Sequence, residues 1–177
     1  MKICYKIVLI TALIFSSFCT TAAERANIYK YSRDLPKKEL TGSTGNKITL
    51  DDFRDNFTIA VFWSRYCIPC LRELKSLSRF AAKTKNDGIR VIMISPKSEW
   101  IGGFDEQKQF LHNFEADNLE IYVDEREAVA SAFGIFSSPV SILISRNSQE
   151  IGRIRGSINW NTSEVIEYIY KIKAEKG

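Results

Sequence analysis

The sequence predicts an α/β fold in which a central mixed sheet carries helices on both faces. Short apolar runs rich in β-branched residues alternate along the chain with segments whose apolar residues recur at helical spacing. Strands that alternate with helices favour parallel neighbours in one sheet, and a closing hairpin adds an antiparallel part. The chain has 177 residues, of which 45% are hydrophobic and 26% are charged, as is ordinary for one globular domain.

Charge and composition exclude several classes of protein. The apolar content is too high for a disordered chain, and no internal repeat or low-complexity segment is present. A net charge of +4, spread along the chain without a basic run, does not indicate a nucleic-acid partner. Nothing beyond the fold itself offers a dimerisation segment, so we expect a monomer.

The N-terminal segment predicts an export signal rather than part of the fold. Lys2 and Lys6 precede the apolar stretch Ile7–Phe18, and small residues follow as far as Ala23. We expect cleavage near Ala23; the alternative is that residues 7–23 remain as an anchor in the inner membrane. Either way the rest of the chain is exported, which predicts a periplasmic protein that touches the membrane only through an uncleaved leader.

Three parts of the chain follow from these patterns. Residues 1–23 are the leader, residues 24–46 a loop-rich lead-in, and residues 47–177 the folded domain. Prolines and glycines punctuate the lead-in, which lacks a clean apolar period. We therefore expect loops there, with room for a short hairpin at the edge of the sheet.

The first strand and the helix after it carry the clearest patterns. Thr58–Trp63 is an apolar run rich in β-formers, which is typical of a strand buried on both faces. Over Pro69–Asn86 leucines and a phenylalanine recur at helical spacing, and Asp87-Gly88 supplies a helix stop. Ile89–Ser95 is a second buried strand, which Pro96 ends.

The middle of the chain contains two further helices and one short strand. Phe104–Phe114 places its phenylalanines and a leucine on one stripe, which predicts a helix. Leu119–Val123 predicts a short strand. Glu125–Phe133 predicts a helix, and Gly134 closes it.

The C-terminal part predicts a hairpin and a last helix. Val140–Ser145 and Glu150–Arg155 are strands that a polar turn joins. Thr162 or Ser163 can cap a helix that runs to about Lys173 with its isoleucines inward. The complete order, β-α-β-α-β-α-β-β-α, is the outline of a thioredoxin-like fold with an extra helix inserted centrally.

Two cysteines stand where the first strand gives way to the helix. Cys67 and Cys70 form a C-x-x-C motif, and they are the only cysteines left once the leader is removed. Unpaired N–H groups and the positive end of the helix dipole would favour the Cys67 thiolate and lower its pKa. Cys70, one turn further on, could then resolve a mixed disulfide. Pro69 suits the first turn of such a helix.

Three other roles for the cysteine pair are alternatives to redox exchange. Zinc needs four ligands, and the exported chain adds only His112 to the two cysteines. A purely structural disulfide across so short a loop would restrict the unfolded chain little. A binding module with inactive cysteines is the third alternative. The sequence indicates no metal and no nucleotide cofactor, because the cysteines themselves are the redox centre.

The segment Phe62–Glu73, FWSRYCIPCLRE, resembles the active-site segment of exported thioredoxin-like proteins of the TlpA/ResA/CcmG type. These are periplasmic or membrane-anchored thiol–disulfide oxidoreductases, and the resemblance extends over about Thr49–Ile169. It implies that the Cys67 thiol attacks the disulfide of a partner and that Cys70 resolves the resulting mixed disulfide. It also implies protein thiols and disulfides as substrates, and a membrane protein that resupplies electrons.

The resemblance assigns roles to further residues. Pro139 would be a cis-proline beside the cysteines, although the residues alone favour a plain trans proline. The backbone of Ser138, just before it, would pair with the substrate chain. Tyr66 replaces the usual tryptophan as a flat aromatic lid. Glu73, in C-x-x-C-x-x-E, would shuttle the proton of the resolving thiol if burial raises its pKa. The alternative is a solvated glutamate that pairs with a nearby Lys or Arg.

Departures from the family pattern leave the direction of electron flow open. Val140 stands where the CcmG type carries an acidic signature, which argues against a dedicated role in cytochrome maturation. Ile68-Pro69 matches the motif of neither reducing thioredoxin nor the strong oxidant DsbA. The resemblance favours reduction of partner disulfides, and an oxidase or isomerase of the same fold is the alternative. A copper-binding chaperone of this fold is a further alternative, but its C-x-x-x-C spacing and distant histidine differ from the pattern here.

Overall fold

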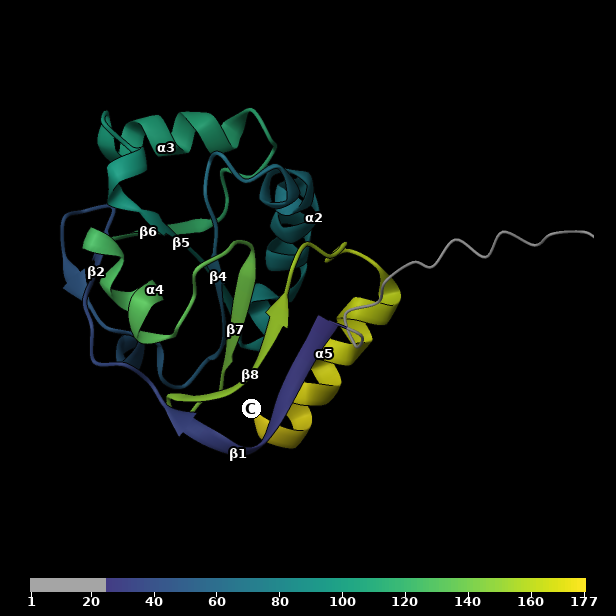
Figure 1. Ribbon diagram of the computed structural model, residues 1–177. Coiled ribbons are helices and arrows are strands. Elements are labelled where there is room, and N and C mark those ends of the chain that lie inside the picture. Colours follow the sequence, from purple (N-terminus) through teal and green to yellow (C-terminus); the bar gives the residue numbers. More distant parts are fainter. Residues whose placement is uncertain (1–24) are drawn as a thin grey trace, which may run out of the picture.

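The computed structural model describes residues 25–177, and an eight-stranded mixed sheet forms its centre (Figure 1). The predicted leader, residues 1–23, lies outside the described residues. No helix within residues 25–177 combines the length and the apolar character that crossing a membrane requires.

The bounds of the elements follow the expected order. The strands are β1 Ala26–Asp34, β2 Leu40–Gly42, β3 Lys47–Ile48, β4 Phe57–Phe62, β5 Ile89–Pro96, β6 Glu120–Asp124, β7 Val140–Ile144 and β8 Gln149–Arg155. The helices are α2 Ile68–Thr84, α3 Gly103–His112, α4 Ala128–Ala132 and α5 Ser163–Lys176, with 3₁₀ turns η1 Leu50–Phe53, η2 Lys85–Asp87, η3 Lys97–Glu99 and η4 Glu125–Glu127. Every strand and helix predicted after residue 57 is present.

The sheet is mixed, as the sequence predicts. β4, β5 and β6 are parallel neighbours, whereas β7 pairs antiparallel with both β4 and β8. The full order is β1-β8-β7-β4-β5-β6-β2-β3. Because β4 lies between β5 and β7, the cysteine motif that follows β4 emerges between the ends of these two strands.

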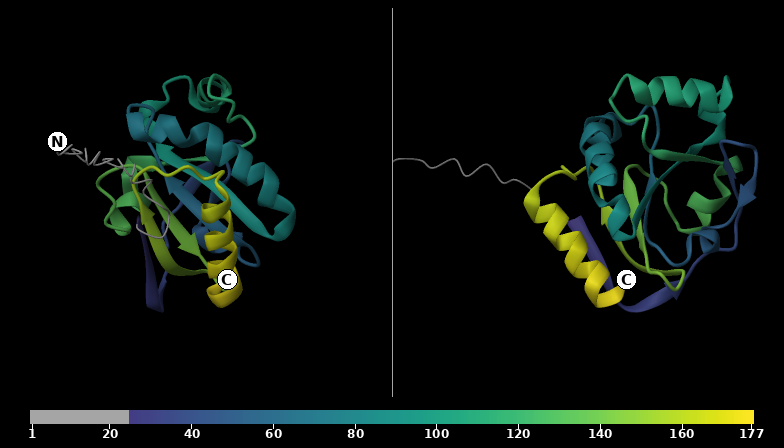
Figure 2. Two further views of the ribbon diagram at one scale, coloured as in Figure 1. Left: turned by 90° about the vertical axis from the view of Figure 1, so that its right-hand side faces the viewer. Right: turned by 180° about the vertical axis from the view of Figure 1, so that it is seen from behind.

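Helices and turns cover the two faces of the sheet. α2 and α5 pack on one face through residues such as Leu77 and Ile169, and α3 joins this side through Leu111. α4 and η1 cover the other face through Val129 and Phe53. Figures 1 and 2 show α2 and α5 on one side of the sheet and α4 on the opposite side.

The lead-in differs from the loop-rich segment that the sequence predicts. β1 is nine residues long and pairs antiparallel with β8 along the edge of the sheet. Within β1 only Tyr29 is buried, so the apolar alternation that identifies a strand is missing. Gly152 permits the close pairing, because a Cβ there would lie 2.8 Å from the carbonyl oxygen of Asn27. β2 and β3 form the short edge hairpin.

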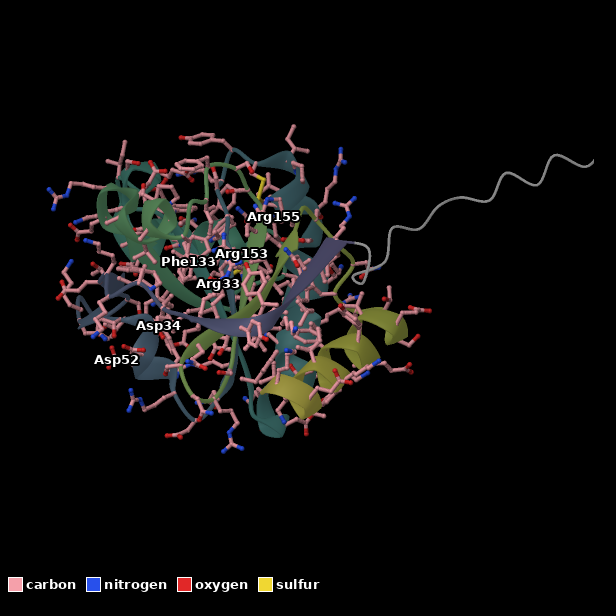
Figure 3. The ribbon with its side chains drawn as sticks, turned by 60° about the horizontal axis from the view of Figure 1, so that its bottom comes forward. Arg33, Asp34, Asp52, Phe133, Arg153 and Arg155 are labelled. Carbon is pink, nitrogen blue, oxygen red and sulfur yellow. A yellow bond between two sulfur atoms is a disulfide. The ribbon has the colours of Figure 1, made fainter. Side chains whose placement is uncertain are left out.

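A buried polar cluster also joins β1 to β8. Arg153 and Glu150 form a buried ion pair on β8, and the Tyr29 hydroxyl donates to Glu150 at 2.9 Å. Arg153 also donates to the carbonyl of Phe133 at 2.8 Å, and Figure 3 labels both residues. Each buried charge therefore has partners, which buried charges require.

The helix predicted at residues 125–133 begins later than expected. α4 starts at Ala128, and in η4 before it Arg126 and Glu127 have left-handed φ angles of 55° and 54°. The carboxylate of Asp124 accepts two N–H groups from the first turn of α4, at 3.1 and 2.8 Å. This side-chain cap from the end of β6 sets where the helix starts.

Candidate active site

Cys67 occupies the N-cap of α2, after β4 and a short loop. Its sulfur accepts a hydrogen bond from the backbone N–H of Cys70 at 3.2 Å. The two cysteines form a disulfide, the yellow bond in Figure 3, with their Cα atoms 5.2 Å apart. Pro69 lies in the first turn, where its missing N–H has no partner to lose. The start of the helix therefore presents N–H groups to Cys67, as the sequence predicts.

The two cysteines differ in exposure. Cys67 is half-buried, whereas Cys70 is 1% exposed on the inner face of α2. A partner can therefore reach the sulfur of Cys67 but not that of Cys70. This is the division that an attacking and a resolving thiol need.

The Ser138-Pro139 segment precedes β7 at the same end of the sheet. The peptide bond between these residues is cis, as the resemblance implies. β7 pairs with β4 so that Val140 lies opposite Phe62, which brings the segment to the strand end from which the cysteine motif leaves. Pro139 is buried and its carbonyl accepts the N–H of Gly156 at 2.9 Å, whereas Ser138 is exposed.

Glu73 is a buried carboxylate on α2, with 3% of its surface exposed. Its Oε2 accepts the backbone N–H of Ile158 at 3.1 Å and the indole N–H of Trp160 at 3.3 Å. Burial outweighs these hydrogen bonds and raises the pKa of Glu73 to about 7. Glu73 lies on the same inner face of α2 as Cys70, three residues further on. The alternative of a solvated glutamate is therefore wrong.

Exposed apolar side chains surround this site. Tyr66 is 76% exposed immediately before Cys67, and Ile68 immediately after it is also exposed. Phe136, in the loop before Pro139, is 89% exposed. The sequence did not indicate that Ile68 and Phe136 are exposed, because it does not show whether an apolar side chain faces the core or the solvent.

Arg65 connects the cysteine loop to the inserted segment, a contact that the sequence did not indicate. Its backbone N–H donates to the Glu99 carboxylate at 2.9 Å, and its guanidinium donates to the Glu99 carbonyl at 3.0 Å and to Glu106. The guanidinium also lies 4.6 Å from the centre of the Trp100 ring. These partners follow Arg65 by more than 30 residues, so no local pattern could indicate them.

A cavity of about 280 Å³ opens between the cysteine loop and the loop before β7. Ser64 lines it from the first loop and Ser138 from the second, and Glu99 and Asp124 contribute carboxylates. Burial raises the pKa of Asp124. The cavity leaves space beside Ser138 for a side chain of a bound peptide.

The candidate third metal ligand lies on the surface. His112, in the last turn of α3, is exposed, with its Nδ1 3.7 Å from a carboxylate oxygen of Asp117. In the described part of the chain, no group of three or more His, Cys, Asp and Glu side chains is placed to hold a metal ion. His112 is thus a surface residue of α3.

The sequence matches known proteins over most of its length. Residues 32–168 match the AhpC/TSA family. A thiol-disulfide oxidoreductase named ResA, from Bacillus thuringiensis subsp. konkukian, is 26% identical over 141 residues, which are 79% of this chain and 77% of the relative.

Solved structures share the fold. A thiol:disulfide interchange protein from Bacteroides sp. superposes with a TM-score of 0.65 at 15% identity, over 81% of this chain and 90% of that one. An exposed lipoprotein thioredoxin from Streptococcus pneumoniae gives a TM-score of 0.60 at 20% identity, over 77% of this chain and 97% of that one. These likenesses confirm the thioredoxin-like fold.

Proposed function

This chain belongs to the AhpC/TSA family and is a thiol–disulfide oxidoreductase of thioredoxin-like fold. We propose that it reduces disulfides of exported proteins through Cys67 and Cys70. The observation that carries the proposal is the position of the disulfide at the N-terminus of α2, with one accessible and one enclosed sulfur. A disulfide across so short a loop contributes little as a cross-link, which favours a role in exchange.

The reaction consists of two thiol–disulfide exchanges. In the dithiol state the Cys67 thiolate attacks one sulfur of the partner's disulfide, a mixed disulfide forms, and the other partner sulfur leaves as a thiolate that takes up a proton. Cys70 then loses its proton and attacks the sulfur of Cys67, which releases the second partner thiol. The partner gains two electrons and two protons, and Cys67 and Cys70 end as a disulfide.

Glu73 is the group that would accept the proton of Cys70 in the second exchange. A carboxyl whose pKa is about 7 changes its protonation near neutral pH, as a proton acceptor in this step must. Cys70 and Glu73 are both enclosed, so bulk water has little access to either. Their positions on one face of α2 keep the two groups close throughout the reaction.

Ser138, Pro139 and Tyr66 would bind the substrate chain. The exposed backbone at Ser138 can pair with an extended peptide, which gives affinity without a requirement for one sequence. The exposed rings of Tyr66 and Phe136 would contact apolar side chains of that peptide. Pro139, which is buried, holds this segment in place from inside.

We place this activity in the periplasm. The predicted leader at residues 1–23 supports export, and the resemblance of the motif segment supports the reducing direction. An oxidising compartment would convert the dithiol to the disulfide, so the cycle needs an electron donor. A membrane protein is the proposed donor, because it can carry electrons from inside the cell.

Trapping of a mixed disulfide tests the proposal. Reduced Cys70→Ser, mixed with a peptide that holds one disulfide, should form a covalent one-to-one adduct that mass spectrometry detects. In the parent, Cys70 should resolve the corresponding mixed disulfide, so that the dithiol peptide is released and no adduct accumulates. Cys67→Ser is the matched control and should form no adduct, because Cys70 is enclosed. No adduct with Cys70→Ser, or an equal yield with Cys67→Ser, would refute the assigned roles.

A further inference from the structure

A groove of about 480 Å³ lies between α2 and the loop that joins β8 to α5. Four cations line it, namely Arg25, Arg72, Lys75 and Arg79, and none of the described residues that line it is acidic. The other lining residues are uncharged, namely Ser76 of α2 and Ser157, Ile158, Asn159 and Asn161 of the loop. We call this feature the basic groove.

The cations of α2 form one row that starts near the cysteines. Arg72, Lys75 and Arg79 are spaced by three and four residues, so they share a face of the helix, and all three are exposed. Arg72 follows Cys67 by five residues, which is about 7 Å along a helix axis. The basic groove therefore begins about one and a half helical turns after the attacking cysteine.

Two carboxyl groups lie near these four cations, because Arg25 interacts with buried Glu73 and partly offsets the rise that burial causes in its pKa, and Glu115 lies beside α2. Glu115 contacts Lys75 and lies 3.9 Å from Arg79, but its side chain is well exposed, and such pairs contribute little. Within residues 25–177 Arg72 forms no ion pair. The buried Nε of Arg25 has no hydrogen-bond acceptor among the same residues. With four cations against two nearby carboxyl groups, the groove keeps a net positive charge.

The basic groove is continuous with the redox site. Ser157 and Ile158 line the groove, and the backbone N–H of Ile158 also donates to the buried carboxyl of Glu73. One loop thus forms the floor of the groove on one side and holds Glu73 on the other. A ligand in the groove lies against the structure that positions Glu73.

We propose that the basic groove docks an acidic segment of the protein partner, with several Asp or Glu side chains close to the partner's cysteines. The inference rests on the proposed exchange with protein partners. Arginine guanidinium groups suit carboxylates because they donate in a planar fork, and a positive cleft accelerates encounter with negative partners. An anionic bilayer would offer the same sign of charge. A protruding segment fits the concave site better, because Arg25 is half-buried in its wall.

Two synthetic peptides with the same internal disulfide test the docking. One carries four Asp residues beside the disulfide and the other carries four Ser residues. At low salt the reduced parent should react with the acidic peptide about tenfold faster, and high salt should bring the ratio of the two rates close to one. In the double variant Arg72→Glu/Arg79→Glu the low-salt ratio should fall below one.

Lys83→Glu/Lys171→Glu is the matched control, because it makes the same change in net charge at exposed positions outside the groove. This control should keep the ratio of the parent. Equal rates for both peptides with the parent at low salt would overturn the docking proposal while leaving the exchange function intact. Failure of the parent to react with either peptide would instead overturn the exchange function, and the docking proposal with it.

Anionic vesicles separate the membrane from the protein partner. The reduced and oxidised parent are tested for binding to vesicles that contain phosphatidylglycerol. Binding that Arg72→Glu/Arg79→Glu abolishes, together with equal peptide rates, would assign the groove to a lipid surface and overturn the proposal. A tenfold peptide preference without vesicle binding is the result expected for an acidic protein segment.

Discussion

Cys67, Cys70 and Glu73 are three residues apart in turn, and the first lies in a different environment from the other two. Cys67 is the half-buried N-cap, whereas Cys70 and Glu73 follow on the inner face of α2. This order arises from the helical period, which returns to the same face after three or four residues. Attack by a partner is thereby separated in space from the internal proton and thiol steps.

Glu73→Gln should change how stability depends on pH. The folded state raises the pKa of Glu73 from 4.5 to about 7, so the folded protein binds this proton more tightly than the unfolded chain does. The associated stability is complete below about pH 4.5 and is lost as the pH rises through about 7. Between pH 5 and pH 8 the free energy of unfolding of the parent should therefore fall by about 2 kcal/mol relative to Glu73→Gln.

Urea unfolding of the oxidised proteins at both pH values measures this difference. Glu164→Gln, which changes an exposed glutamate on α5, should follow the parent. Identical pH slopes for the parent and Glu73→Gln would mean that the carboxyl of Glu73 titrates normally. The proposed role of Glu73 as proton acceptor would then lose its physical basis.

The inserted segment η3–α3 supports the active site through one residue of the cysteine loop. Arg65 binds Glu99 with both its backbone and its side chain, and binds Glu106 on α3 with its side chain. Within the loop, the N–H of Cys67 also donates to the carbonyl of Ser64 at 3.1 Å. The loop that presents Cys67 is therefore held both from within and by a separate element.

Arg65→Ala should loosen this loop without unfolding the protein. Glu106 and the Glu99 carbonyl lose a charged donor, so amide hydrogen exchange at residues 64–67 should become about tenfold faster. Lys108→Ala removes an exposed charge from the same helix and should leave this exchange unchanged. Unaltered exchange in Arg65→Ala would show that other contacts hold the loop.

The edge strand β1 depends on a position without a side chain. A Cβ at Gly152 would lie 2.7 Å from Ile28 Cδ1 and 2.8 Å from the Asn27 carbonyl oxygen, and the backbone oxygen cannot move freely. Gly152→Ala should therefore push β1 from β8 and lower the free energy of unfolding by about 2 kcal/mol. Urea unfolding checks this against Lys30→Ala, an exposed change on β1. Parent-like stability in Gly152→Ala would mean that β1 adds little to the fold.

Elements that local patterns describe were predicted well, and those that distant contacts determine were not. The buried runs of β4 and β5 and the leucine spacing of α2 are visible in the sequence itself. β1 is mostly exposed and becomes a strand only because β8 pairs with it. The late start of α4 has a local cause, because Asp124 at the end of the preceding strand caps the N–H groups of Val129 and Ala130, a contact that the apolar pattern does not show.

The order of the strands assembles the site from distant parts of the chain. β7 returns beside β4, so Ser138-Pro139 reaches the cysteine motif, and the loop after β8 reaches Glu73. The cysteines were predicted from the residues, and the cis peptide bond only from the resemblance. Neither source indicated the basic groove, because its cations belong to the start of the described chain and to one face of α2, which only the complete fold brings together.

The reduction potential of the Cys67–Cys70 pair tests most directly whether the protein is a reductant. The chain without residues 1–23 is equilibrated in graded thiol buffers, and the free thiols are counted at each ratio. The account predicts a value near or below that of thioredoxin, about −270 mV, because a reductant must hold its electrons less tightly than its substrates do. A value near that of DsbA, about −120 mV, would contradict it and identify an oxidant of partner thiols.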